Sequence, residues 1–328
     1  MKAIVQDGYG PPELLQLRDV EQPVPASDEV LIQVHAAALN AYDWHVMRGA
    51  PYVARFMDRS VFGRHGPKRS IRGRDFAGRV AAVGSGVTGF RPGDEVYGEA
   101  DGAFAEYVCA RADMVGPKPA NLTFAQAAAI PLAGNTALMG LRDVGGVQPG
   151  QRVLVNGASG GVGTFAVQIA KSLGAGVTGV CSTRNVDLVR SIGADVVVDY
   201  TRDDFARMDR RYDLVFDLVG NRSLADCRRV LAPTGTLVLS GGGSSEGRSI
   251  IGPIGLMARA LLLSPLVRQR VRVLMARASR QNLATLRELA EAGKLTPVID
   301  RTYTLPEVPD AIRYLETEHA RAKVVVTI

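Results

Sequence analysis

The sequence predicts an α/β protein in two domains, one with a doubly wound parallel sheet and one resembling a β-barrel. Short strands separated by Gly and Pro dominate residues 1–122, strands and helices alternate in the middle of the chain, and strand patterns return after residue 296. At 328 residues, the chain also exceeds the size at which one hydrophobic core keeps growing. We therefore expect residues 1–122 and 279–328 to form one domain, with the second domain, residues 123–278, between them.

The N-terminal region is predicted to contain short strands ended by turn residues such as Gly10, Pro11 and Pro12. Strands at this density favour a barrel-like module. Residues 52–72 show no strand pattern and are rich in Arg and Lys. Such a loop is either a functional lid or a mobile segment, and the sequence leaves both possibilities open. The predicted strands are Lys2–Val5, Leu14–Asp19, Glu29–Ala37, Asp75–Val83, Glu95–Tyr97 and Ala105–Cys109.

A helix is predicted from Leu122 to Val144, capped by Thr123 and interrupted at Pro131. Beyond it comes a strand of apolar residues that begins at Val153, a cluster of glycines, and a helical pattern that runs to Lys171. A second predicted strand, Gly176–Cys181, follows at the distance that a βαβ unit requires.

The glycine cluster predicts a site for the pyrophosphate of a dinucleotide. A helix start offers unpaired N–H groups and partial positive charge, and glycines let a phosphate approach the backbone. The spacing departs from the standard fingerprint, and the alternative is a glycine-rich loop that binds nothing. The glycines are Gly157, Gly160, Gly161 and Gly163, and the expected cofactor contacts within the turn are Ser159, Gly160, Gly161 and Val162.

The residues after the second strand favour NADPH over NADH. An NAD site places an acid about 20 residues beyond the glycines, whereas an NADP site often supplies Arg. Here Ser182 and Thr183 can donate hydroxyls to a 2′-phosphate and Arg184 can pair with it, while no acid appears before Asp187. The alternative is that Arg184 is an ordinary solvated residue near a helix start.

The strand and helix alternation continues through Asp195–Tyr200, Asp213–Asp217, Ser223–Leu231 and Thr236–Ser240. Such alternation predicts a parallel sheet covered by helices, whose ligands lie beyond the carboxyl ends of its strands. Further candidate cofactor contacts therefore follow two of these strands, although they can equally be simple strand-ending turns: Val219, Gly220, Ser240, Gly241 and Gly242.

Composition limits the partners and the compartment. The net charge of +6 and the pI of about 9.4 suit an anionic ligand, but the basic residues are dispersed and no nucleic-acid-binding motif is recognisable, so a phosphorylated cofactor is the simpler partner.

Three widely spaced cysteines argue against a disulfide framework or a clustered zinc, and no signal peptide is recognisable at the N-terminus, so we expect a cytoplasmic protein. Residues 250–267 are apolar but contain Pro253, Arg259 and Pro265, which argues against a membrane span.

Several motifs are spread along the chain: Met1–Val5, Leu39–Asp43, Arg91–Val96, Ala103–Val108, Val153–Lys171 and Lys323–Val326. Together they resemble the medium-chain dehydrogenase/reductase superfamily, and within it the zinc-independent quinone oxidoreductase branch that includes zeta-crystallin. The resemblance spans essentially the whole chain. It implies a GroES-like catalytic domain from both chain ends, a Rossmann domain between them, commonly a homodimer, and hydride transfer from NADPH to small-molecule quinones or enones.

The resemblance also implies that no metal takes part. The zinc-dependent alcohol dehydrogenases of the superfamily carry a Cys ligand where this chain has Asn40, and Gly-His-Glu where it has Gly73, Arg74 and Asp75. The cysteine-rich lobe that holds their structural zinc is missing too. A zinc alcohol dehydrogenase with diverged ligands is the alternative.

Without zinc, a hydrogen-bond donor must face the negative charge that develops on the acceptor oxygen. The resemblance places Asn40 and Tyr42 beside the nicotinamide as catalytic candidates; the alternative is a buried polar turn that satisfies backbone groups. It also places Thr136, Tyr200 and Lys323 near NADPH. Two other functions stay open: reduction or dehydrogenation of other carbonyl compounds, and a binding protein that holds NADPH as a redox sensor or structural component with little turnover.

Overall fold

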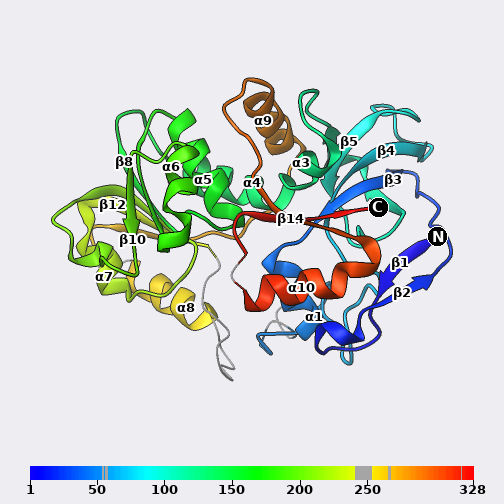
Figure 1. Cartoon of the computed structure of the whole chain (residues 1–328), viewed down its shortest axis with the longest axis horizontal. Coiled ribbons are helices and arrows are strands. Elements are labelled where there is room, and N and C mark those ends of the chain that lie inside the picture. Colours follow the sequence, from blue (N-terminus) through cyan, green and yellow to red (C-terminus); the bar gives the residue numbers. More distant parts are fainter. Residues whose placement is uncertain (54, 56–57, 241–252, 265–266, 319) are drawn as a thin grey trace. The chain divides into compact units, whose positions relative to one another are not determined.

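The computed structural model describes all residues except 54, 56–57, 241–252, 265–266 and 319, and it divides into two compact units (Figure 1). Unit 1 consists of Met1–Asn135 and Ala278–Ile328, and unit 2 consists of Thr136–Arg277. The predicted fold class, a Rossmann sheet with a GroES-like barrel domain, is confirmed by the sheet order of unit 2 and by the strand arrangement of unit 1. Candidate residues Gly241 and Gly242, and parts of the segments 52–72 and 250–267, lie outside the described residues.

Unit 1 is built on a mainly antiparallel sheet, in which β14 and β15 pair in parallel. Among its described residues, a seven-stranded sheet has the path β14-β15-β3-β4-β5-β7, with β6 paired to β3. A separate hairpin-like pair joins β1 to β2. The strands are β1 (Lys2–Val5), β2 (Gln16–Asp19), β3 (Glu29–Ala38), β4 (Asp75–Val83), β5 (Glu95–Glu99), β6 (Tyr107–Arg111), β7 (Val115–Pro117), β14 (Ile299–Thr304) and β15 (Lys323–Thr327).

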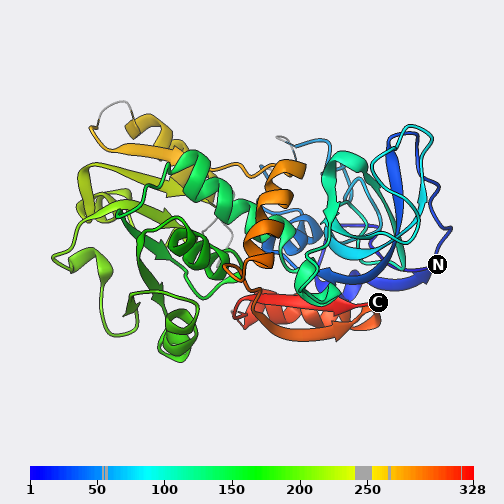
Figure 2. The same ribbon diagram turned by 90° about the horizontal axis from the view of Figure 1, so that it is seen from above.

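The chain returns to this sheet at its C-terminal end, where β15 lies antiparallel to β3 (Figure 2). Alternating apolar side chains explain the pairing: Val324 and Val326 are fully buried in the same cluster as Ile32 and Val34 of β3. The helices of unit 1 are α1 (Ala41–Arg48), α3 (Phe124–Ala128), α9 (Arg280–Glu291), α10 (Val308–Thr317) and the first part of α4 (Pro131–Leu138).

The first boundary between the units falls after Asn135, whereas the sequence placed it after Leu122. Two contacts account for the difference. The ring of Phe124, at the start of α3, stacks on His35 of β3 with centroids 4.5 Å apart, and Asn282 of α9 donates its amide to Asn135 at 2.7 Å. Residues 123–135 therefore pack with the antiparallel sheet, which a pattern of helical spacing does not reveal.

Unit 2 is a doubly wound sheet. All strand pairs between its described residues are parallel, in the order β10-β9-β8-β11-β12-β13, which is the 3-2-1-4-5-6 order of a dinucleotide-binding fold. The strands are β8 (Arg152–Asn156), β9 (Gly176–Cys181), β10 (Val196–Asp199), β11 (Tyr212–Asp217), β12 (Leu231–Leu239) and β13 (Arg270–Val273). Their helices are α5 (Gly161–Ser172), α6 (Val186–Ser191), α7 (Leu224–Arg229) and α8 (Pro253–Leu263).

Local differences from the sequence patterns are small and have physical causes. The predicted helix Ser223–Leu231 is shorter, because Leu231 already pairs with Tyr212 in the sheet. The predicted strand Leu14–Asp19 begins at Gln16 instead, because Leu14 belongs to a 3-10 turn, Pro12–Leu14, whose first residue fixes the backbone. No helix among the described residues has the length and apolar character needed to cross a membrane.

Candidate active site

The glycine turn of unit 2 connects β8 to α5, and two of its glycines are required by sterics. Gly157 has φ +89°, which is unfavourable for a residue with a side chain, and an added Cβ would lie 2.7 Å from Val219 Cγ2. At Gly163 an added Cβ would lie 2.0 Å from the carbonyl oxygen of Gly157. These two positions fold the turn tightly, so that the helix starts at Gly161 directly after it.

The start of α5 offers backbone donors to an anion. The first N–H groups of a helix have no intrahelical acceptor, and the helix dipole adds partial positive charge there. Gly160 is the N-cap residue, and a Cβ added there would lie 3.4 Å from the Gly157 carbonyl oxygen, an ordinary van der Waals contact. The predicted contacts Ser159, Gly160, Gly161 and Val162 therefore lie on a turn whose geometry suits a pyrophosphate.

A carboxylate that the sequence interpretation missed holds this turn in place. Asp217 ends β11, and its Oδ1 accepts hydrogen bonds from the Asn156 amide at 2.8 Å and from the N–H groups of Val219 and Gly220 at 3.1 and 3.0 Å. These bonds fix Val219 against Gly157. The signal in the sequence is an acid that directly follows the apolar strand Leu214–Phe216.

The predicted 2′-phosphate residues lie at the end of β9. Asn185 donates its amide to the hydroxyls of Ser159 and Ser182, at 3.1 and 3.2 Å, and so ties this segment to the glycine turn. Thr183 donates its hydroxyl to Asp199 at 2.6 Å. Arg184 is exposed beside them.

Asp199 corrects one step of the sequence argument, which took the absence of a nearby acid as evidence for NADPH. Strand β10 lies beside β9 in the parallel sheet, so its last residue, Asp199, comes next to Thr183 although 16 positions separate them in the chain. The carboxylate also accepts the N–H and hydroxyl of Thr201, at 3.0 and 2.8 Å. Two hydroxyls and one N–H thus satisfy it.

The remaining cofactor candidates are distributed over unit 2. Tyr200 is 51% exposed and donates its N–H to Cys181 of β9 at 3.0 Å, which holds it at the same end of the sheet. Ser240 donates its N–H to the Asp217 carbonyl, also at 3.0 Å, beyond the end of β12. Thr136 is buried within α4.

Unit 1 contains a second candidate site, a buried cluster of polar and charged groups that we call the amide cluster: Asn40, Asp43, Asp75 and Lys323. The sheet register assembles it. Residue Ala38 of β3 pairs with Asp75 of β4 on one side and with Val325 of β15 on the other, so Asn40, two residues later, lies between Asp75 and Lys323. All four side chains are at most 6% exposed.

Hydrogen bonds hold every member of the amide cluster. The Asn40 amide donates to Asp75 at 2.9 Å, and its oxygen accepts from the Lys323 ammonium at 2.6 Å. Lys323 also donates to the Leu39 carbonyl at 2.9 Å and lies 3.5 Å from Asp75. Asp43 accepts the backbone N–H of Asn40 at 2.8 Å and so fixes the first turn of α1.

Burial dominates the electrostatics of this cluster. It raises the pKa of Asp43 to about 6 and raises the pKa of Asp75 despite the nearby Lys323 ammonium. Burial also lowers the pKa of Lys323, while Asp75 and Asp43 act in the opposite direction. The Lys323 ammonium is 2% exposed and donates to the Leu39 carbonyl and the Asn40 oxygen, while its place near NADPH stays a prediction from the resemblance.

Tyr42, the second catalytic candidate, lies on α1 next to an arginine. The Arg74 guanidinium is 5.0 Å from the centroid of the Tyr42 ring, and it pairs with Glu99 at 2.8 Å and with Asp101 at 3.6 Å. Burial, followed by the Asp101 charge, raises the pKa of Tyr42 to about 12. Tyr42 is therefore a neutral hydroxyl throughout the physiological range and can donate a hydrogen bond.

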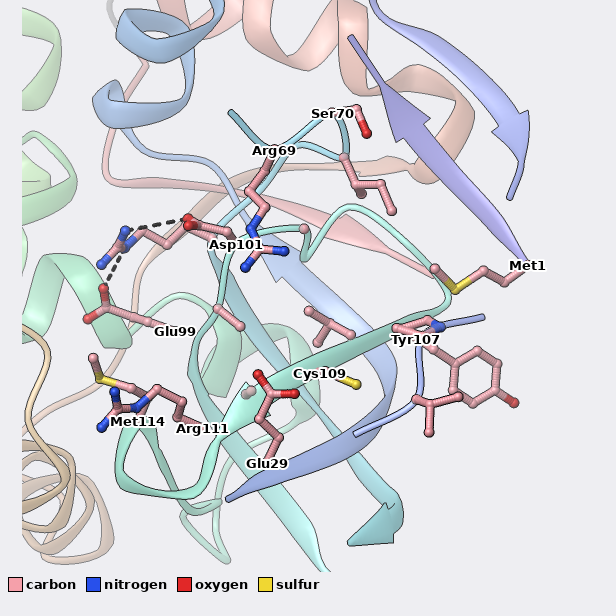
Figure 3. Close-up of a pocket in the computed structure, with 18 of the residues that line it drawn as sticks. Met1, Glu29, Arg69, Ser70, Glu99, Asp101, Tyr107, Cys109, Arg111 and Met114 are labelled. Carbon is pink, nitrogen blue, oxygen red and sulfur yellow. Dashed lines mark hydrogen bonds and ion pairs between the residues drawn. The ribbon is translucent and has the colours of Figure 1, made fainter. Parts of the chain in front are cut away.

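A cavity of about 490 Å³ opens in unit 1 beside this arginine. Figure 3 shows Glu99 and Asp101 on one wall, joined by dashed lines to the guanidinium between them, and Cys109 facing the hollow. Burial raises the pKa of the Cys109 thiol to about 11, so the thiol is protonated at neutral pH and is a poor nucleophile. The cavity thus adds a charged wall near Tyr42 but no reactive group.

The sheet order and glycine turn of unit 2, together with the barrel of unit 1, define a nucleotide-dependent dehydrogenase or reductase. Comparison with known families agrees: residues 26–120 match the alcohol dehydrogenase GroES-like domain, and residues 192–326 match the zinc-binding dehydrogenase domain. The chain belongs to the medium-chain dehydrogenase/reductase superfamily, in its zeta-crystallin-like quinone oxidoreductase branch.

Individual relatives cover nearly the whole chain. The NADPH-dependent alkenal/one oxidoreductase of Arabidopsis thaliana chloroplasts is 34% identical over 99% of this chain and 79% of its own. The quinone oxidoreductase of Coxiella burnetii is 34% identical, with a TM-score of 0.87 over 100% of this chain and 99% of its own. The Escherichia coli quinone oxidoreductase, solved with NADPH, is 25% identical with a TM-score of 0.83 over 100% of both chains.

Proposed function

We propose that this protein is an NADPH-dependent oxidoreductase that transfers hydride to quinones or activated enones without zinc. The observation that carries the proposal is the glycine turn of unit 2, whose two sterically required glycines place the free N–H groups of α5 beyond the sheet. Relatives named as quinone oxidoreductases and as an NADPH-dependent alkenal/one oxidoreductase support the same activity.

The residues of unit 2 fit NADPH. The turn from Ser159 to Val162 would hold the pyrophosphate, and Ser182, Thr183 and Arg184 would hold the 2′-phosphate, because hydroxyls and a guanidinium are its natural donors. In this structure Thr183 donates its one hydroxyl hydrogen to Asp199 at 2.6 Å, so the Thr183 hydroxyl would donate to the phosphate only after turning away from Asp199. The remaining proposed contacts are Thr136, Tyr200, Val219 and Ser240, and the sequence adds Gly241 and Gly242.

The residues of unit 1 do not fit zinc. Catalytic zinc takes Cys, His, Asp or Glu ligands, whereas the family's Cys and His positions hold the Asn40 amide and the Arg74 guanidinium. Asp75, at the Glu position, already binds the Asn40 amide and lies 3.5 Å from the Lys323 ammonium. The Lys323 ammonium is 2.6 Å from the Asn40 oxygen and already supplies a positive charge there. Within the described ranges, no group of three or more His, Cys, Asp or Glu is placed to hold a metal ion.

Hydrogen-bond donors would take over the role of the metal. Bound NADPH supplies a hydride, and as the hydride reaches an electron-poor carbon, negative charge grows on the acceptor carbonyl oxygen. The Asn40 amide and the neutral Tyr42 hydroxyl are the donors that unit 1 offers to such an oxygen. Enones need this help more than quinones do, because a quinone becomes aromatic as it is reduced.

The test is a titration with NADPH followed by stopped-flow oxidation with 1,4-benzoquinone and with an alkyl enone. We expect saturable binding and rapid loss of the reduced-nicotinamide absorbance with both acceptors. Binding without oxidation would support a redox sensor or structural protein instead, and oxidation by simple aldehydes alone would support a reductase of other carbonyl compounds. Metal analysis of the active protein should find less than stoichiometric zinc.

We also propose that the protein is a homodimer in the cytoplasm. The edge strand β13 pairs on one side with β12, and its other side has no strand partner in the described part of the chain. An edge of this kind can pair with a second copy. Light scattering coupled to size exclusion tests the dimer, and cell fractionation tests the compartment.

A further inference from the structure

The amide cluster fixes which way the Asn40 side chain points. An amide oxygen and nitrogen are hard to distinguish by shape, and their assignment rests on their partners. Lys323 is a donor without acceptor capacity, so it must face the Asn40 oxygen, and Asp75 is an acceptor when ionised, so it must face the nitrogen. The two neighbours are of opposite character and lie on opposite sides of one amide.

The rest of the cluster keeps these two neighbours in place. Asp75 also accepts the N–H of Leu132 at 3.2 Å, and Lys323 is anchored by the Leu39 carbonyl. Asp43 fixes the backbone of Asn40 itself. Because all of these groups are buried, a flipped amide would leave a buried ammonium facing N–H groups and a carboxylate facing an oxygen, which is strongly unfavourable.

This arrangement leaves one hydrogen of the amide nitrogen weakly engaged. One of the two hydrogens bonds to Asp75 at 2.9 Å, while the other potential acceptor, the Ala38 carbonyl, is 3.5 Å away, at the limit of a hydrogen bond. A cation bound to the amide oxygen polarises the N–H groups and strengthens their donation.

We propose that Lys323 is a positioning residue that acts through Asn40: it locks and polarises the amide so that an N–H is directed to the acceptor carbonyl. The inference rests on the proposed function, and it assigns Lys323 to the reacting end of the site rather than to direct contact with NADPH.

A double-mutant cycle tests this role. K323M should lower kcat for enone reduction at least tenfold while the Kd for NADPH changes less than twofold. If Lys323 acts through Asn40, K323M should cause no further loss in an N40A background, because the group it serves is gone. Equal losses in both backgrounds, or a loss confined to NADPH binding, would overturn the proposal.

The control is K118M. Lys118 is also a buried lysine of unit 1 that donates to backbone carbonyls, at 2.6 Å to Leu122 and 3.1 Å to Pro119, but none of these contacts involves the amide cluster. K118M should lower the melting temperature and leave kcat within twofold. If K323M does not fold because Asp75 is left unpaired, K323M is tested in a D75N background and compared with D75N alone, because Asp75 also holds the Asn40 nitrogen; kcat should again fall at least tenfold from D75N to the pair.

A second readout needs neither NADPH nor turnover. In protein labelled with ¹⁵N at asparagine, the side-chain amide signals of Asn40, identified by their loss in N40A, should exchange slowly with solvent. K323M should shift these signals and speed their exchange, and K118M should not. Unchanged signals in K323M would refute the positioning role even in an active enzyme, whereas shifted signals in a protein that oxidises no NADPH would refute the proposed function and leave the positioning intact.

Discussion

The two candidate sites of this protein are built in opposite ways. The glycine turn of unit 2 is proposed to bind with backbone groups, and the residues that its geometry requires are Gly157 and Gly163, which lack side chains. The amide cluster of unit 1 consists of side chains, four of them polar or charged and all buried. The glycine turn depends on positions that leave no room for a Cβ, and the amide cluster depends on buried charges that compensate each other.

The difference teaches how each site fails. A backbone site tolerates side-chain exchange around it but not an added carbon, because the close approach of two backbone segments leaves no room. A cluster of buried charges tolerates little change in charge, because the hydrogen bonds and ion pairs between its members offset the desolvation cost of burying them. Substitutions that separate these two kinds of failure test the comparison directly.

The largest effect is expected for G163A. Its Cβ would lie 2.0 Å from the Gly157 carbonyl oxygen, so the turn must open, at a cost of about 3 kcal/mol in unfolding free energy and with loss of NADPH binding. G160A is the control for stability from the same turn, because its Cβ would lie at an ordinary contact distance of 3.4 Å and its φ of −82° suits alanine; it is no control for NADPH binding, since Gly160 is itself a proposed cofactor contact. Urea unfolding and NADPH titration measure both; equal stabilities of the two variants would contradict the steric argument.

The next effect concerns charge in the amide cluster and depends on pH. The pKa of Asp43 is about 6 in the folded protein and 3.8 in its ordinary state, so between pH 4 and 6 the folded chain binds more protons than the unfolded chain. The contribution of Asp43 to the unfolding free energy therefore falls by about 2–3 kcal/mol as pH rises through this interval.

D43N removes this titration and keeps an oxygen for the Asn40 N–H. Urea unfolding at pH 4, 5, 6 and 7 should show D43N gaining on the wild type as pH rises. D28N, at an exposed turn, serves as the control and should track the wild type. Parallel curves for D43N and the wild type would show that the Asp43 carboxyl does not titrate in this range.

A smaller effect is expected for R184A at the phosphate end of unit 2. Loss of a guanidinium that pairs with the 2′-phosphate should weaken NADPH binding about tenfold, or about 1.4 kcal/mol, and leave NADH binding within twofold. Fluorescence titration with both cofactors makes the comparison. Equal losses of NADPH and NADH binding would contradict the assignment of Arg184 to the 2′-phosphate. R190A, on the neighbouring helix α6, replaces the same residue type and serves as the control.

The smallest effect is expected for Y42F. Removing one neutral donor should lower kcat for an enone about fivefold and kcat for benzoquinone less, because the quinone needs less stabilisation of its oxygen. The pKa of Tyr42 is about 12, so the ratio between wild type and variant should stay constant from pH 7 to 10. A ratio that falls toward 1 in this range would mean that the hydroxyl ionises there and is not the donor.

The fold was largely predictable because it depends on local signals. Apolar runs such as Leu214–Phe216 and the glycines between Gly157 and Gly163 are contiguous in the chain, and their spacing alone indicates strand, turn and helix. The compact units divide after Asn135 and the sequence interpretation after Leu122; the stacking contact between Phe124 and His35, which no local pattern shows, lies between these two positions.

The sequence by itself determined the glycine turn, because a tight strand-to-helix turn needs residues that lack a Cβ at fixed positions and no distant partner supplies that freedom. It also determined which regions are rich in strands and which alternate strands with helices, because these patterns are formed by residues that are neighbours in the chain. Tertiary structure alone decided that Lys323 binds Asn40, 283 positions away, and that Asp199 reaches Thr183. Both contacts arise from strand pairing, whose register is set by the packing of whole sheets rather than by neighbouring residues.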